Sequence, residues 1–184
     1  IGSVAAPTAG LHFSESVFTQ IEKAQISTAY INLHIGLGTF LPVREIDIKK
    51  HNMHKEKFSI PQDTLKLIEK TRANNKPIIC VGTTTLRALE TLFLKSRALN
   101  VSAASLCNQE LQSELFIYPQ DKNTRYKPQA ANALITNFHQ PKSTLFMLIC
   151  ALIGKEETHR LYTHAITNRF KLFSFGDSSL LWLR

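Results

Sequence analysis

The chain has 184 residues, enough for one domain with a sizeable buried core, and its 43% hydrophobic and 20% charged residues are typical of a soluble globular protein. Its 22 lysines and arginines exceed its 14 aspartates and glutamates, which gives a formal net charge of +8. That excess is a modest electrostatic footprint for RNA or another polyanion, although a merely basic protein would also show it.

Two further features limit the class of protein. Cys80, Cys107 and Cys150 are odd in number and scattered in apolar runs, which excludes a disulfide frame or a zinc knuckle and predicts reduced core thiols. The sequence shows no signal peptide, and its longest apolar run, residues 145–153, is too short to span a membrane. We therefore expect a cytoplasmic protein with no membrane partner.

Two kinds of segment follow each other in turn along the chain. Some have apolar residues at helical spacing, and the others are short strand-like segments that are either wholly apolar or apolar at every second residue. In the first of the alternating segments, His34 lies on the face opposite the apolar side chains. Polar, irregular stretches over 95–114 and 119–131 predict surface loops. The expected elements are a helix after Ser14, a strand over 30–35, a helix over 61–74, a strand over 77–81, a helix after 82–85, strands over 115–118 and 133–136, helices over 143–153 and 156–168, and a strand over 170–175.

This alternation predicts an α/β fold with mainly parallel strands, organised as a single domain over 1–184. The helix over 143–153 is almost wholly apolar, so we expect it to be buried all round. In folds of this class ligands bind beyond the carboxyl ends of the strands, so the turns that follow strands are the first places to look for a site.

One such turn is Gly82-Thr83-Thr84-Thr85, between an expected strand and the next helix. Free backbone N–H groups and the helix dipole favour an anion there, and the hydroxyls of Thr83 and Thr84 add donors. Arg87 and Glu90 follow one turn apart. The pattern predicts a cradle for a phosphate or carboxylate, with an ordinary N-cap and a surface ion pair as the alternative. No Walker A or G-x-G-x-x-G sequence is present.

A second polar turn joins the strand over 133–136 to the apolar helix. It carries Asn137, His139, Lys142 and Ser143 around Pro141. His139 could carry a proton near neutral pH, and Lys142 could neutralise a phosphate or carboxylate. The alternative is a capping turn with a hydrogen-bonded structural histidine.

Two more histidines and one aspartate stand beside glycines, which allow close approach of a ligand. His12 follows Gly10, His34 precedes Gly36, and Asp177 is a candidate acid or base in a Gly-Asp pair. For each histidine the alternative is a hydrogen bond to a loop carbonyl, and for Asp177 it is an ordinary turn.

Since strand carboxyl ends and helix amino ends share one rim in an α/β fold, we expect His12, His34, His139 and Lys142 to line one pocket. We also expect the crowded histidines to have a lowered pKa through mutual repulsion.

The spacing His51-x-x-His54-x-Glu56 invites a metal interpretation. Zinc sites need third and fourth ligands with their own spacing, and none stands out. We predict no metal site, and an RNA-facing or loop-ordering role for this segment.

Six segments of the chain agree with the sequence motifs of one protein family in their residues, order and spacing. In them the chain resembles the S-adenosylmethionine:tRNA ribosyltransferase-isomerase family of queuosine biosynthesis. The resemblance runs over almost the whole chain but covers only about the C-terminal half of the family's usual length. The segments are 2–13 (GSVAAPTAGLHF), 34–40 (HIGLGTF), 51–56 (HNMHKE), 81–87 (VGTTTLR), 136–144 (TNFHQPKST) and 173–177 (FSFGD).

The resemblance implies transfer and isomerisation of the ribosyl moiety of S-adenosylmethionine onto 7-aminomethyl-7-deazaguanine in tRNA, which gives epoxyqueuosine-tRNA and releases adenine and methionine. It implies tRNA and S-adenosylmethionine as partners, S-adenosylmethionine as co-substrate with no other cofactor, and no metal. A base must remove a proton next to the sulfonium, and the leaving adenine needs a proton. The catalytic candidates are His12, His34, His139 and Asp177. The substrate-binding candidates are Thr8, Gly10, Gly36, Thr39, Thr83, Thr84, Arg87, Asn137, Lys142 and Ser143.

The family fold implies a barrel-like α/β domain, here without the family's small β-barrel domain. The chain departs from the family pattern at Gln120, Asn132, Gln140 and Phe175, where glycine, aspartate, leucine and tyrosine are usual. Two other functions stay open at this point: a truncated noncatalytic RNA-binding domain of the same fold, and a small-molecule phosphate-binding enzyme that uses the 82–85 turn.

Overall fold

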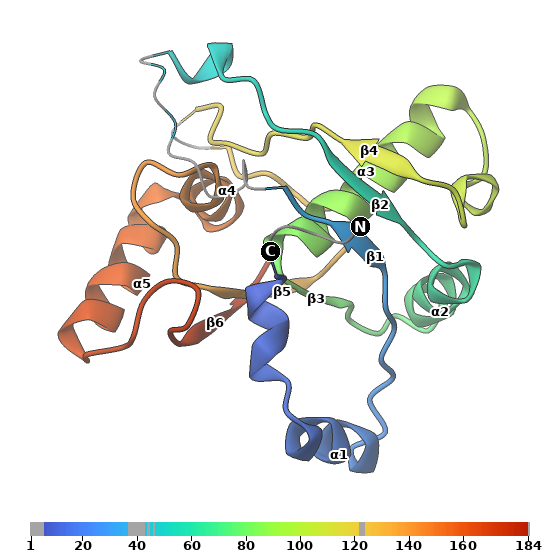
Figure 1. The fold of residues 1–184 in the computed structure, drawn as a ribbon, viewed down its shortest axis with the longest axis horizontal. Helices are drawn as coiled ribbons and strands as arrows, with labels where there is room; N and C mark the ends of the chain where they lie inside the picture. The colour runs from blue at the N-terminus through green and yellow to red at the C-terminus, as the bar shows by residue number, and fades with distance from the viewer. Residues whose placement is uncertain (1–5, 37–42, 44, 46, 122–123, 184) are drawn as a thin grey trace.

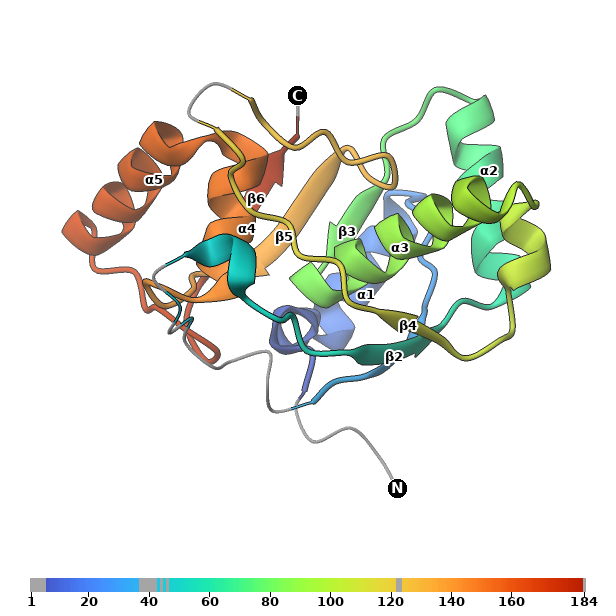
Figure 2. The same ribbon diagram turned by 90° about the horizontal axis from the view of Figure 1, so that it is seen from above.

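A computed structural model describes residues 6–36, 43, 45, 47–121 and 124–183. They form two three-stranded sheets with helices around them, and α2 and α5 lie at opposite sides of the molecule (Figures 1 and 2). The elements, with short 3-10 helices marked η, are η1 Thr8–His12, α1 Glu15–Lys23, β1 Asn32–His34, η3 Ile48–Lys50, β2 Glu56–Ser59, α2 Gln62–Ala73, β3 Ile79–Val81, α3 Thr83–Leu99, η4 Ala103–Leu106, β4 Leu111–Ser113, β5 Ala133–Asn137, α4 Thr144–Ile153, α5 Lys155–Thr167 and β6 Ser178–Trp182.

The first sheet has the order β1-β2-β4 and is antiparallel throughout, with Leu33 opposite Phe58 and Phe58 opposite Leu111. The second sheet has the order β3-β5-β6. In it β3 runs parallel to β5, whereas β6 runs antiparallel to β5 with Asn137 opposite Ser178. A mixed α/β fold is confirmed.

The expectation of mainly parallel strands is wrong, because β3 with β5 is the single parallel pair among the described strands. The connection from β5 to β6 gives the physical reason. After α4 and α5, the chain returns to the end of β5 that it left, where the Phe173 N–H donates to the Phe138 carbonyl at 3.0 Å. The next strand can then only run back along β5. The described strands also form two separate small sheets and no closed barrel.

Helix α3 contacts strands of both sheets and so lies at the centre of the core (Figure 2). Its apolar side chains recur at helical spacing, and Leu86, Leu89 and Leu92 are all buried. Helix α4 is buried over most of its surface, as its composition predicts, and Gly154 ends it. Buried side chains of both helices belong to the main hydrophobic core.

The predicted helices all form, and Ser14 caps α1 by accepting a hydrogen bond from the Val17 N–H. Two predicted strands do not form. Residues 115–118 are irregular, and β4 lies instead at Leu111–Ser113, inside a segment expected to be a loop. Residues 170–175 belong to a turn, and β6, which follows it, was not predicted.

The three cysteines are buried and unpaired, as predicted. Ile79 is 42% exposed although its segment was expected to be a buried strand, because β3 lies at an edge of its sheet. None of the helices in the described part of the chain is long and apolar enough to cross a bilayer.

Candidate functional site

A cavity of about 90 Å³ lies beyond the carboxyl ends of β3 and β5, where the sequence predicts a site. Five segments that are far apart in the sequence meet around it. The lining residues are Ala6, Pro7, Thr8, Ala9, Leu33, Ile35, Gly82, Thr83, Thr84, Thr85, Thr136, Asn137, Phe138, His139, Gln140, Ser143, Leu145, Phe173 and Ser174.

The turn at the start of α3 forms one wall of the cavity. Gly82 has φ 91° and ψ 142°, a conformation that side chains other than glycine's strain to adopt, and its N–H donates to the Ile135 carbonyl at 2.8 Å. Thr83 and Thr84 follow it at the first turn of the 17-residue helix, whose first N–H groups have no acceptor within the helix. This wall therefore offers the donors and dipole that favour an anionic group.

The segment after β5 forms the opposite wall. Ser143 is the N-cap of α4: its Oγ accepts from the Phe146 N–H at 3.1 Å and donates to the Gln140 carbonyl at 2.7 Å. Its hydroxyl is therefore already used in capping. Lys142 is exposed with φ 62°, and it does not line the cavity. The expectation that Lys142 shares one pocket with the histidines is therefore wrong. Lys142 is the left-handed residue directly before Ser143, the N-cap of α4.

His139 lines the cavity from this same wall. Its Nε2 lies 2.9 Å from the Thr136 Oγ1, and its backbone N–H donates to the Tyr162 hydroxyl at 2.7 Å. Burial lowers the pKa of His139 to about 4, so the ring is neutral at physiological pH. The lowered pKa was expected, but its expected cause, repulsion between histidines, was wrong.

Asn137 links three segments at the edge of the cavity. Its Oδ1 accepts from the Thr8 hydroxyl at 3.2 Å, and its Nδ2 lies 3.0 Å from the His12 Nε2 and 3.5 Å from the Gly176 carbonyl oxygen. His12 does not line the cavity itself but contacts Asn137, which does. The structure therefore brings His12 and His139 to one site.

Asp177 closes a turn beside the cavity instead of pointing into it. Its carboxylate accepts from the Lys171 N–H at 2.7 Å, and its own N–H donates to the Lys171 carbonyl at 2.6 Å. The turn carries Phe173 and Ser174 into the lining. These contacts with Lys171 are those of the ordinary turn that was the alternative to catalysis.

His34 lies on the other face of its strand. Leu33 and Ile35 line the cavity, so the intervening side chain points away, as alternation in a strand requires. His34 is exposed and pairs in register with Lys57, which forms an ion pair with Glu110 at 2.7 Å. The expected convergence of three histidines is wrong for His34.

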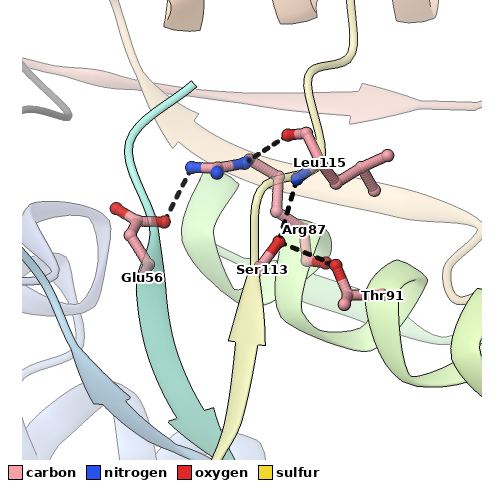
Figure 3. A network of polar contacts seen from close by, with 5 residues as sticks. All are labelled: Glu56, Arg87, Thr91, Ser113 and Leu115. Carbon is pink, nitrogen blue, oxygen red and sulfur yellow. Dashed lines mark hydrogen bonds and ion pairs between the residues drawn. The ribbon is translucent and has the colours of Figure 1, made fainter. Parts of the chain in front are cut away.

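Arg87 is buried beneath the β1-β2-β4 sheet and does not line the cavity (Figure 3). Its Nη1 lies 2.7 Å from the Glu56 Oε2, and its Nε donates to the Leu115 carbonyl at 2.9 Å. Arg87 lies one helical turn further along α3 than Thr83, which lines the cavity. At that position its counter-charge is the carboxylate of Glu56 and not a ligand anion. The expected anion-binding role of Arg87 is wrong.

Glu90 is also buried, and it does not form the surface ion pair with Arg87 that was the alternative. Its carboxylate accepts from the Tyr126 hydroxyl at 2.8 Å and from the Ala130 N–H at 2.5 Å. These two hydrogen bonds hold the loop that precedes β5 against α3.

The His51-x-x-His54-x-Glu56 segment does not gather its side chains. His51 pairs with Glu45 at 2.9 Å, His54 is exposed, and Glu56 pairs with Arg87. Within the described residues no group of three or more His, Cys, Asp or Glu could hold a metal ion.

The remaining candidates lie at the margin of the site. Gly10 is exposed in η1, Gly36 follows Ile35 outside the lining, and Thr39 falls outside the described residues. Sequence reasoning missed several lining residues. Leu33 and Ile35 were detectable as the strand face opposite His34, whereas Phe173 and Ser174 were hidden because their segment was predicted to be a strand.

Five of the six segments that carry the family resemblance contribute to this cavity, namely 2–13, 34–40, 81–87, 136–144 and 173–177. A family model described as "Queuosine biosynthesis protein" matches residues 1–181. The chain belongs to the queuosine biosynthesis protein family. The resemblance inferred from the sequence is thereby confirmed.

Relatives within this family carry a consistent name. S-adenosylmethionine:tRNA ribosyltransferase-isomerase of Rickettsia canadensis is 46% identical over 181 residues, which are 98% of this chain and 44% of that protein. The protein of the same name from Treponema denticola is 44% identical over 180 residues, 98% of this chain and 49% of that protein.

The fold is also similar to a solved structure. The crystal structure of S-adenosylmethionine tRNA ribosyltransferase from Thermotoga maritima matches with a TM-score of 0.68 and 33% identity, over 94% of this chain and 50% of that chain. The present chain thus spans about half the length of the queuosine biosynthesis proteins that it matches.

Proposed function

We propose that this chain is part of an S-adenosylmethionine:tRNA ribosyltransferase-isomerase, which transfers and isomerises the ribosyl moiety of S-adenosylmethionine onto 7-aminomethyl-7-deazaguanine in tRNA to give epoxyqueuosine-tRNA. The observation that carries the proposal is the meeting of five family segments around one cavity. The name shared by relatives of 44–46% identity supports it. The partners are tRNA and S-adenosylmethionine, and the proposed compartment is the cytoplasm, where tRNA is modified.

The size of the cavity limits what these residues hold by themselves. Its volume of about 90 Å³ is well below the roughly 300–1,000 Å³ of pockets that enclose a whole small molecule. It accommodates one polar end of S-adenosylmethionine, and the rest of the donor extends beyond it. The α3 wall, with Thr83 and Thr84, suits the methionine carboxylate, because backbone N–H groups and the helix dipole favour an anion.

Two histidines are the proposed proton-handling groups of the site. His139 is neutral at physiological pH, which is the form that can accept a proton. His12 lies on the other side of Asn137, where it can hydrogen-bond to a substrate group. Thr8 and Ser143 complete the polar lining, with hydroxyls that also hold the surrounding turns in place.

The test of the activity uses the 184-residue chain, S-adenosylmethionine labelled in its adenine, and tRNA with 7-aminomethyl-7-deazaguanine at the wobble position. A parallel sample adds the N-terminal half of the Treponema denticola relative as a separate polypeptide. We expect adenine release that requires the modified base, with tRNA bearing guanine at that position as the control. Binding of tRNA without adenine release in either sample would contradict the proposal and identify an RNA-binding domain.

The anion-binding wall has a matched pair of variants. Thr84→Val removes a hydroxyl at the cavity and should weaken binding of S-adenosylmethionine several-fold, measured by calorimetry. Thr71→Val in α2 removes a hydroxyl that bonds only the Leu67 carbonyl, and should leave binding unchanged. Equal effects of the two substitutions would contradict the proposed role of the wall.

A further inference from the structure

The side-chain amide of Asn137 has a single possible orientation. The Gly176 carbonyl oxygen can only accept a hydrogen bond, so the Asn137 atom that faces it at 3.5 Å must be the nitrogen. The amide oxygen then faces Thr8, whose hydroxyl donates to it at 3.2 Å. The Gly176 contact excludes the flipped arrangement, which would place two carbonyl oxygens face to face, and the Thr8 hydroxyl, which can donate or accept, fits the oxygen side.

This orientation decides which nitrogen of His12 carries the proton. Asn137 Nδ2 has two hydrogens, and with one directed at Gly176 the other points to the His12 Nε2 at 3.0 Å. That ring nitrogen must therefore accept, so it holds a lone pair. In a neutral imidazole the one proton then lies on Nδ1.

The partners of Asn137 are themselves held firmly. Asn137 is 3% exposed and is the last residue of β5, paired with Ser178 in β6. Gly176 lies in a turn so tight that an added Cβ would come 2.1 Å from the Lys171 carbonyl oxygen, and the Asp177 carboxylate closes that turn. Neither the amide nor its carbonyl partner can therefore rotate away at low cost.

We infer that Asn137 is a positioning residue that holds the neutral His12 ring in its Nδ1–H form, so that His12 offers the substrate a hydrogen-bond donor and not a base. The assignment of His12 to catalysis rests on the proposed function, whereas the tautomer rests on the contacts alone. Asn137 also has both its N–H groups engaged by protein atoms, so they are not available to bind substrate. Of the two histidines at the site, His139 is left as the proton acceptor.

The tautomer can be measured directly. In the 184-residue chain labelled with ¹⁵N-histidine, two-bond ¹H–¹⁵N correlation spectra at pH 8 distinguish a protonated from an unprotonated ring nitrogen, and a His12→Gln variant assigns the signal. We expect His12 to show a protonated Nδ1 and an unprotonated Nε2. The opposite pattern, which free neutral histidine prefers, would overturn the inference.

Asn137→Asp supplies the decisive variant, because a carboxylate can only accept and requires a proton on His12 Nε2. We expect the tautomer to switch, and an unchanged Nδ1–H form would overturn the inference. Asn168→Asp is the matched control: its amide nitrogen lies 3.3 Å from the His164 Nδ1, so the His12 signals should not move. If Asn137→Asp does not fold, Asn137→Ala removes the amide donor, so the Nε2–H form that free neutral histidine prefers should appear, and an unchanged Nδ1–H form would overturn the inference.

These spectra need neither S-adenosylmethionine nor tRNA. A chain with the Nδ1–H form that never releases adenine would contradict the proposed function alone. A chain that releases adenine with His12 in the Nε2–H form would contradict the positioning role alone.

Discussion

Arg87 and Glu56 form a buried ion pair that joins α3 to β2, with the residues 1% and 3% exposed (Figure 3). Taking both charges out of water is costly, and their attraction offsets that cost only while both are present. Burial lowers the pKa of Arg87, and the charge of Glu56 opposes this shift. The pair therefore acts as one unit in the core.

Removing one partner should be worse than removing both. Arg87→Met should lower the free energy of unfolding by about 3–5 kcal/mol, because it takes the Arg87 charge away from the buried Glu56 carboxylate. The double variant Arg87→Met/Glu56→Leu should lose much less free energy of unfolding than the sum of the losses in the single variants Arg87→Met and Glu56→Leu. Urea unfolding measures all three, with Lys66→Met in the exposed pair with Asp63 as the control, for which little change is expected. Additive losses would contradict coupling of the pair.

His139 makes stability depend on pH. Its folded pKa of about 4 lies below the ordinary value of 6.5, so the unfolded chain binds more protons between these two values. The stability associated with the neutral ring is therefore fully present above pH 6.5 and is lost as the pH falls toward 4. The loss has an upper bound of about 3 kcal/mol, and is smaller because the ring borders the cavity.

The variant His139→Gln should flatten this part of the stability curve, as measured by thermal unfolding at a series of pH values between 4 and 7. His54 is exposed, so His54→Gln should leave the curve as it is. The same slope in His139→Gln as in the parent chain would mean that other groups, and not His139, cause the acid sensitivity.

At the scale of elements, the turn over 171–177 positions both β6 and one side of the cavity. Phe173 adopts φ 70° and donates to the Phe138 carbonyl, and Asp177 closes the turn against Lys171. The turn replaces the strand expected over 170–175 and starts β6 in the direction opposite to β5. Its compactness depends on Gly176, where no space exists for a Cβ.

Gly176→Ala should therefore be strongly destabilising. The new Cβ would meet the backbone of Lys171 and Leu172 at 2.1–2.5 Å, and only movement of the whole turn relieves it. We expect a loss of about 3 kcal/mol or more in urea unfolding. Gly10→Ala is the control, since nothing lies within 4 Å of its added Cβ. Similar stability of the two variants would mean that the turn is not as tight as described.

For the whole molecule, the net charge of +8 has a consequence for RNA. Binding to tRNA should be weak and steeply dependent on salt, because released counterions dominate contacts between basic side chains and phosphates. Three neutralised phosphates already give a slope of about −2.7 in log K against log salt for a duplex, and somewhat less for single strands. Fluorescence anisotropy between low and physiological salt measures the slope. A value near zero would contradict electrostatic binding.

Local patterns of the sequence were sufficient for much of this protein. The cap at Ser14, the helix spacing in α3 and the apolar run of α4 each depend on neighbours within a few residues, so the helices could be predicted. The strand alternation that turns His34 away from Leu33 was equally visible. Family membership followed from six short segments, because their order and spacing need no knowledge of the fold.

Tertiary structure alone decided the direction of β6, the burial of Arg87 and the contacts of Asp177. Each depends on a partner that is distant in the sequence or in another element. Ser178 at the start of β6 lies opposite Asn137, Arg87 pairs with Glu56, and Asp177 contacts the Lys171 backbone. A charged residue one helical turn after a polar turn has the same local pattern whether its counter-charge is a ligand or a buried side chain. Only the packing of α3 against the β1-β2-β4 sheet gives Arg87 the second of these, because it brings the carboxylate of Glu56 within 2.7 Å.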